Sequence, residues 1–196
     1  MDDLYYLIVV DAQNDFIDGA LGTKEAQECV PKICEKIKNF RDDGRVILTK
    51  DTHNSNYLST NEGVALPVKH CIEGTHGWGI NDSVMKAYLE RILKLNSNGS
   101  NIEHFDIINK PTFGSERLYK IIDDDLELKG AVWENLHIEI VGFCTDICVI
   151  TNALILKTHF YNNAEIIVDS SCCAGVTPEK HNAALEVMKS CQIKVI

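Results

Sequence analysis

The sequence predicts an α/β fold of three layers, in which helices cover both faces of a central parallel sheet of about six strands. Strand-like apolar runs alternate with helical segments along the chain, a pattern typical of parallel sheets with right-handed crossovers. The first run, Leu4–Asp11, is continuously apolar and ends in an acid, as expected for a central strand buried on both faces. The chain has 196 residues, of which 45% are hydrophobic, so we expect a single domain over residues 1–196.

After the first strand, the next part of the chain is expected to form a helix, a strand and a long loop. Lys24–Asp43 is expected to be helical because its apolar residues share one face and Gly44 closes the pattern. Arg45–Lys50 is the expected second strand, and it is again followed by an acid, Asp51. Thr52–Gly79 is irregular and rich in Asn, Ser, Gly and His. A loop of this length in a compact domain is usually functional or disordered.

The middle of the chain repeats the alternation of helix and strand. Ile80–Leu95 is expected to be helical, and the polar stretch Asn96–Asn101 connects it to a third strand, His104–Asn109. Lys110 follows this strand directly. A turn then leads to a short helix, Ser115–Ile122, for which Ser115 is a candidate cap.

The last part of the chain supplies three more strands and two more helices. In Leu136–Ile140 apolar residues alternate with polar ones, the period of a strand with one buried face. Glu165–Asp169 is the expected fifth strand. Pro178–Ser190 is an expected helix with proline near its first turn, and Ile193–Ile196 is a short last strand.

The stretch around Cys148 is the most informative local pattern. Gly142 breaks the strand, and Thr145 stands at the N-cap position before the apolar stretch Ile147–Leu156, which places Cys148 in the first turn of a helix. The unpaired N–H groups and the helix dipole favour an anion there, so we expect the thiol to ionise more readily than usual. Asp146 opposes this, and a cation is therefore expected nearby. Read locally, Cys148 is also compatible with a small buried hydrophobe.

Five candidate residues follow predicted strands, so the topology places them together. Ligands of open parallel sheets bind outside the carboxyl ends of the strands, near the point where strand order reverses. The residues that share this position are Asp11, Asp51, Lys110, Cys148 and Asp169.

Charge and composition exclude several classes of partner. The net charge of −10 argues against nucleic acids and anionic membranes. No apolar run approaches the roughly 18 residues that a membrane span needs. The acidic start of the chain is unlike a secretory signal, and the eight cysteines lie mostly within periodic helix and strand patterns. We therefore expect a cytoplasmic protein with reduced thiols.

Asp11, Lys110 and Cys148 form the most suggestive chemical set. A thiol nucleophile needs a group that takes its proton, which a carboxylate can do, and a positive charge that stabilises the thiolate. Each residue also has an ordinary explanation, because Asp11 could cap a turn, Lys110 could be solvated and Cys148 could lie in the core. His181, on a predicted helix, is expected to satisfy a local hydrogen bond rather than to react.

Three segments resemble the isochorismatase-like cysteine hydrolases, and the nicotinamidase branch in particular. They are Asp11-Ala-Gln-Asn-Asp-Phe16, Lys110-Pro-Thr-Phe113 and Gly142-Phe-Cys-Thr-Asp-Ile-Cys148-Val. The resemblance runs over essentially the whole chain and implies a Rossmann-like fold. By this resemblance Asp11 is the general base, Lys110 the electrostatic partner and Cys148 the nucleophile. It also implies a cis peptide between Phe143 and Cys144, with the N–H groups of Cys144 and Cys148 directed at an oxyanion.

A second constellation lies in the long loop. Asp51 and His53 are two residues apart and point to the same side of an extended segment, and His70 could complete a set of ligands. Imidazole and carboxylate ligands suit zinc, with iron or manganese as alternatives. Alone, this pattern is also compatible with ordinary polar surface residues. The resemblance to nicotinamidases implies a metal held by Asp51, His53 and His70, with Glu62 as a looser match to an additional acid.

The expected substrate pocket departs from the family pattern. Leu66 stands where nicotinamidases usually carry a Trp beside the Pro that precedes the metal-binding His. Phe16 remains as a candidate wall, with Leu21 and Trp78 as weaker ones. The resemblance thus implies a metal-dependent amidohydrolase with nicotinamide as the first substrate to test. Another small amide, a carbamoyl compound or a ureide is the alternative, and a non-catalytic ligand-binding or thiol-sensing protein of the same fold also remains open. The family resemblance further suggests a homo-oligomer.

Overall fold

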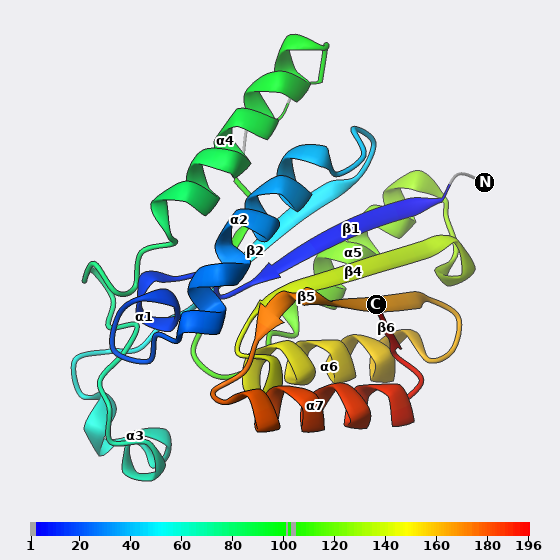
Figure 1. The fold of residues 1–196 in the computed structure, drawn as a ribbon. Coiled ribbons are helices and arrows are strands. Elements are labelled where there is room, and N and C mark those ends of the chain that lie inside the picture. Colours follow the sequence, from blue (N-terminus) through cyan, green and yellow to red (C-terminus); the bar gives the residue numbers. More distant parts are fainter. Residues whose placement is uncertain (1–2, 101, 103–104) are drawn as a thin grey trace.

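The computed structural model describes residues 3–100, 102 and 105–196, and its centre is one sheet of six parallel strands (Figure 1). The strand order is β3-β2-β1-β4-β5-β6, and every neighbouring pair is parallel. The strands are β1 (Leu4–Val10), β2 (Arg45–Asp51), β3 (Ile107–Lys110), β4 (Leu136–Phe143), β5 (Glu165–Ala174) and β6 (Lys194–Val195). The predicted fold class is confirmed.

Helices cover both faces of the sheet (Figure 1). α2 (Lys24–Asn39) and α4 (Asp82–Ser97) pack on one face, and α5 (Arg117–Lys129), α6 (Ile150–Phe160) and α7 (Pro178–Ser190) pack on the other. The shorter helical segments are α1 (Asn14–Ile17), α3 (Asn61–Ala65), the 3₁₀ turns Tyr57–Ser59 and Trp133–Asn135, and the π-helical turn Thr145–Val149. No helix among the described residues is both long and apolar enough to span a bilayer.

The central strand β1 explains why the sheet has two hydrophobic cores. Tyr6, Ile8 and Val10 point into the core under α5, α6 and α7, whereas Leu7 and Val9 point into the core under α2 and α4. Successive side chains of a strand face opposite sides, so a strand covered on both faces must be apolar at every position.

Several predicted element bounds differ from the observed ones. The first long helix ends at Asn39, because Phe40 adopts an extended backbone. The helix predicted at Ser115–Ile122 starts at Arg117 and continues to Lys129, where Gly130 ends it in the left-handed conformation (φ 61°). β3 starts at Ile107 rather than at the predicted His104, which lies outside the described residues.

The prediction that Asp169 lies at the carboxyl ends of the strands is wrong. β5 continues past Asp169 to Ala174, because β4 pairs with it as far as Phe143 opposite Ala174. The carboxylate of Asp169 forms an ion pair with Lys36 of α2 and accepts a hydrogen bond from the hydroxyl of Ser171. Asp169 therefore stabilises the packing of α2 on the sheet and lies away from the strand ends.

The strand order reverses between β1 and β4. From β1 the chain moves outward through β2 to β3 and then returns to β4 on the other side of β1. The crevice of an open α/β sheet is expected at the carboxyl ends of these two strands, and the segments after them carry Asp11 and Cys148.

Candidate active site and metal site

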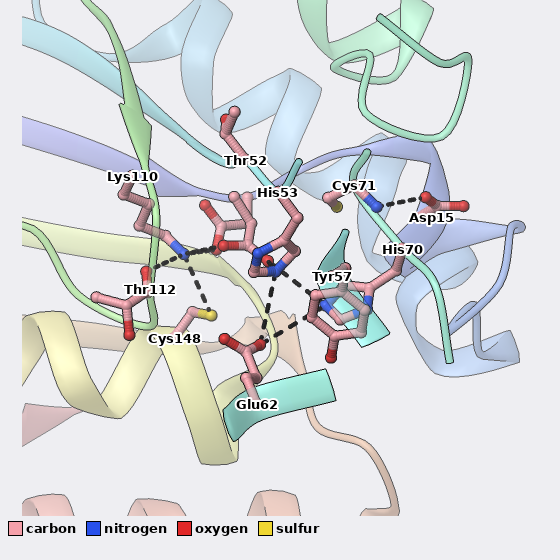
Figure 2. Close-up of polar contacts among 12 residues, drawn as sticks. Asp15, Thr52, His53, Tyr57, Glu62, His70, Cys71, Lys110, Thr112 and Cys148 are labelled. Carbon is pink, nitrogen blue, oxygen red and sulfur yellow. Dashed lines mark hydrogen bonds and ion pairs between the residues drawn. The ribbon is translucent and has the colours of Figure 1, made fainter. Parts of the chain in front are cut away.

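The carboxyl ends of the four strands β1 to β4 bring the predicted catalytic residues together. Figure 2 shows the contact between Lys110 and Cys148. Asp11 follows β1 with a left-handed backbone (φ 47°), which is uncommon for a non-glycine residue. Asp51 and Lys110 are the last residues of β2 and β3, and Cys148 lies in the turn after β4.

Lys110 is the centre of this group. Its Nζ lies 2.6 Å from Oδ2 of Asp11, 3.5 Å from Sγ of Cys148 and 3.4 Å from Oδ1 of Asp51. It also donates a hydrogen bond to the carbonyl of Thr112 at 3.0 Å. Asp11 and Lys110 are almost completely buried, so the charges act on each other with little screening by water.

Two supporting residues were not identified from the sequence. The Thr49 hydroxyl donates to Oδ1 of Asp11 at 2.7 Å. Gln13 accepts a hydrogen bond from the backbone N–H of Asp51 at 2.7 Å, and its amide donates to the backbone carbonyl of Asp51 at 2.9 Å. The alternation of a strand gives a signal for Thr49, which shares a face of β2 with Asp51, but nothing in the local pattern marks Gln13.

The prediction that the Cys148 thiol ionises more readily than usual is wrong. Burial and the negative charge of Asp11 raise the pKa of the Cys148 thiol well above its usual value, although Lys110 opposes this. Burial also raises the pKa of Asp11. Despite burial, the carboxylates of Asp11 and Asp51 raise the pKa of Lys110, so the ammonium stays charged.

The turn that carries Cys148 also differs in its capping. Thr145–Val149 is a π-helical turn that precedes α6, and its N-cap is Cys144, which makes no side-chain cap bond. Thr145 is thus not the N-cap; its hydroxyl lies 2.8 Å from Nδ1 of His181. The peptide between Phe143 and Cys144 is cis, as the family resemblance implied. In the described part of the chain, the N–H groups of Cys144 and Cys148 donate to no protein acceptor outside their own turn.

The four predicted metal ligands converge beside Lys110. One ligand atom from each of Asp51, His53, Glu62 and His70 can be chosen so that all lie within 4.8 Å of one another. Oδ2 of Asp51 lies 2.9 Å from Nε2 of His53 and 3.5 Å from Nε2 of His70. Oε1 of Glu62 lies 3.5 Å from Nε2 of His53. Glu62 comes from α3 and approaches from the loop side (Figure 2).

The donor set fits a divalent cation. Nε2 of His53 is buried and makes no hydrogen bond to any described residue, despite its short contact with Asp51. Nδ1 of His70 lies 2.8 Å from the carbonyl of Val68, a contact that directs the lone pair of Nε2 toward the cluster. Burial opposes ionisation of Asp51, but His53, His70 and Lys110 outweigh it and hold the pKa of this carboxyl well below its usual range. A positive ion would balance the surplus of buried carboxylates.

Of the residues expected to line the substrate pocket, Phe16 borders the cluster of metal ligands, whereas the others make different contacts. The Phe16 ring lies edge-on to His70 at 5.6 Å between centroids and borders the cluster. Trp78 is engaged elsewhere, because its indole N–H donates to Thr52 and Nζ of Lys50 lies over its ring. Leu21 is half-buried and packs against the core under α2, and the carbonyl of Leu66 accepts a hydrogen bond from the Tyr57 hydroxyl. A substrate contact for either leucine stays a prediction.

Tyr57 is a further residue that the sequence did not reveal. Its buried ring lies 4.6 Å from the ring of His53 and 4.9 Å from that of His70, between centroids. Burial and the charge of Glu62 raise the pKa of Tyr57 to about 12, so its hydroxyl stays neutral. The ring therefore packs against both imidazoles and restricts their orientation.

The chain is similar to known proteins in both fold and sequence. The chain has a three-layer α/β arrangement around a parallel sheet, and a solved amidase structure shares this fold over 98% of the chain. The chain belongs to the isochorismatase family, whose model, described as the isochorismatase domain, matches residues 5–94 and 122–196. The resemblance seen in the sequence is confirmed.

Three of the similar proteins are enzymes named for amide substrates. A nicotinamidase of Schizosaccharomyces pombe is 30% identical over 223 aligned residues, covering 97% of this chain and 91% of the relative. A nicotinamidase of Saccharomyces cerevisiae is 24% identical, with coverage of 97% and 98%. The crystal structure of a Pyrococcus horikoshii pyrazinamidase in complex with zinc has 27% sequence identity and a TM-score of 0.72, and covers 98% of both chains. These relatives place the chain among the hydrolases that act on amide C–N bonds.

Proposed function

We propose that this protein is a cysteine amidohydrolase that converts a small carboxamide to its acid and ammonia through a thioester, with nicotinamide as the first substrate. The observation that carries the proposal is the position of Nζ of Lys110, within 2.6 Å of Asp11 and 3.5 Å of Cys148. A buried acid, ammonium and thiol at one point supply a base, a fixed positive charge and a nucleophile. The relatives named nicotinamidase support the choice of substrate.

Asp11 is the proposed proton acceptor. Its Oδ1 accepts a hydrogen bond from Thr49, whereas Oδ2 makes no well-directed hydrogen bond within the part of the chain that the structure describes, even though Lys110 is close. Oδ2 is therefore the oxygen that can take a proton from Cys148. Because the pKa of the thiol is raised by burial, transfer must accompany the attack on the substrate.

The proposed reaction has two halves. Asp11 takes the thiol proton while Sγ of Cys148 bonds to the carboxamide carbon, and the oxyanion so formed lies opposite the N–H groups of Cys144 and Cys148. When the C–N bond breaks, Asp11 passes its proton to the leaving nitrogen and ammonia departs. Asp11 then takes a proton from water as the water attacks the thioester, and returns it to Cys148 as the acid leaves.

The proposed metal ligands are Asp51, His53, Glu62 and His70. A divalent cation held by these residues would supply a Lewis-acid anchor for a ring nitrogen of the substrate. Two imidazoles and two carboxylates suit zinc, with iron or manganese as alternatives, and the zinc in the crystal structure of the Pyrococcus horikoshii pyrazinamidase supports zinc. Phe16 lies beside His70 and is proposed to form a wall for the substrate ring.

A second substrate class follows from Leu66. This half-buried aliphatic residue occupies the place of an expected aromatic side chain, so recognition of a flat ring has less support than the cleavage of an amide. A small aliphatic amide, a carbamoyl compound or a ureide is the second candidate.

Ammonia release from a panel of these amides tests the proposal. Cys148→Ala is expected to abolish release, and Cys34→Ala, which alters a half-buried cysteine of α2, is the matched control. Turnover that survives in Cys148→Ala would refute the nucleophile. Failure of the wild-type protein on every amide, with rapid alkylation of Cys148 at neutral pH, would favour a thiol sensor.

The proposal also covers the number of domains, the cellular location and the oligomeric state. We propose one domain over residues 1–196, a cytoplasmic location and association into a homo-oligomer. All eight cysteines are unpaired thiols, which supports a reducing compartment. Light scattering at several protein concentrations would test the oligomeric state.

A further inference from the structure

The turn that carries the nucleophile is attached to α7 through Thr145. Thr145 follows Cys144 and precedes Cys148, and its side chain is completely buried. Its Oγ1 lies 2.8 Å from Nδ1 of His181, a hydrogen bond between residues 36 positions apart. Neither residue belongs to the proposed group of base, ammonium, nucleophile and metal ligands.

Further contacts hold the same turn against the start of α7. The backbone N–H of Val176 donates to Oδ1 of Asp146 at 2.9 Å. Gly175 permits this approach, because a Cβ there would lie 2.7 Å from Oδ1 of Asp146 and 2.9 Å from the backbone nitrogen of His181. The loop before α7 therefore packs directly on the turn.

His181 lies in the capped first turn of α7. Its backbone N–H donates to the carbonyl of Thr177 at 2.9 Å, and the Thr177 hydroxyl caps the helix by accepting from the N–H of Lys180. The imidazole thus comes from a fixed helical turn. It borders a small cavity of about 190 Å³ whose other lining residues include Glu25 and Asn182.

We propose that His181 is a positioning residue for catalysis: through Thr145 it fixes the backbone of the Cys144–Cys148 turn so that its N–H groups stay directed at the oxyanion. This inference rests on the proposed amidohydrolase function. A hydrogen bond that only stabilised the fold would change the melting temperature. A bond that orients oxyanion donors must also change kcat, because those donors act chiefly in the transition state.

The test compares substitutions at both ends of the bond. His181→Leu and Thr145→Val remove it, whereas His181→Asn and Thr145→Ser each retain a hydrogen-bonding group. We expect kcat for amide hydrolysis to fall about tenfold or more in the first pair, with KM within about twofold of the wild-type value. The conservative pair should recover most of the loss. The double variant should be no slower than either single variant, because one interaction is removed in each case.

His159→Leu is the matched control, since His159 also bonds from a helix to a neighbouring helix, at 2.6 Å to Asp123 of α5. It should lower stability without lowering kcat. Wild-type kcat in His181→Leu, or an equal loss in His159→Leu, would overturn the inference while leaving amide hydrolysis intact.

Hydrogen exchange of the 144–149 peptide gives a readout that needs no substrate. Exchange should rise in His181→Leu and stay unchanged in His159→Leu. Unchanged exchange in His181→Leu would overturn the inference even if no amide were hydrolysed, whereas increased exchange without any wild-type hydrolysis would refute the proposed function alone.

Discussion

Replacing Asp11 by Asn should slow amide hydrolysis by Cys148 but speed the alkylation of its thiol. The substitution keeps the size of the side chain and removes both the proton acceptor and the negative charge. Loss of a general base lowers rates by about 100- to 10,000-fold, so amide hydrolysis should nearly vanish. The thiol should nevertheless ionise more easily, because the charge of Asp11 is one cause of its raised pKa.

The size of the second effect follows from the distances to Lys110. Oδ2 of Asp11 and Sγ of Cys148 lie 2.6 and 3.5 Å from the same nitrogen, so they are at most about 6 Å apart. At an effective dielectric constant of about 20, two unit charges at that separation repel by about 3 kcal/mol. Removing this repulsion corresponds to about 100 times more thiolate at pH 7.

The assay is the rate of alkylation by iodoacetamide, followed at Cys148 by peptide mass spectrometry, beside the rate of ammonia release. Asp18→Asn, at an exposed carboxylate after α1, is the control and should alter neither rate. The reasoning is refuted if Asp11→Asn keeps hydrolysis within about tenfold of wild type, or if alkylation slows together with hydrolysis.

Three further predictions concern the metal site. Removing the cation with a chelator should abolish hydrolysis. Restoring zinc at about 100 times its dissociation constant should stabilise the protein by about 2.7 kcal/mol, which corresponds to a rise in Tm of roughly 5 to 10 °C. An unchanged Tm would contradict the proposed metal site. Glu62→Gln should weaken zinc binding about tenfold or more in calorimetry, whereas Glu73→Gln, outside the cluster, should not. In the metal-free protein Asp51 and Glu62 raise the pKa of His70 despite its burial, so the stability that His70 contributes is complete below the unfolded pKa of about 6.5 and is lost as the pH rises through the folded pKa. Urea unfolding should show this decline above about pH 6.5 in the wild-type protein but not in His70→Asn, and identical profiles would refute it.

The sequence was sufficient for residues whose position depends on topology. Parallel strands end at one edge of a sheet, so Asp11, Asp51 and Lys110 could be placed together before any contact was known. The position of Cys148 followed from Gly142, which lies one residue before the end of β4, and from the apolar helix beyond it.

Properties that depend on distant neighbours could not be predicted in this way. The helix-end context of Cys148 predicted an easily ionised thiol, but complete burial and Asp11 outweigh that local effect. Asp169 ended an apolar run, yet pairing with β4 extended the strand past it. Tyr57 and His181 contact the site only because the long loop and α7 fold against it, and no sequence spacing reports those contacts.

Asp51 has one oxygen near Lys110 and the other near the two histidines. The electrostatic environments of the nucleophile and of the bound cation are therefore not independent, since each competes for the charge of a single carboxylate. Exchanging one metal for another should change the reactivity of Sγ of Cys148, although the metal does not contact it. The metal-free enzyme should therefore differ from the metal-bound form in the rate of its chemical step as well as in its affinity for substrate.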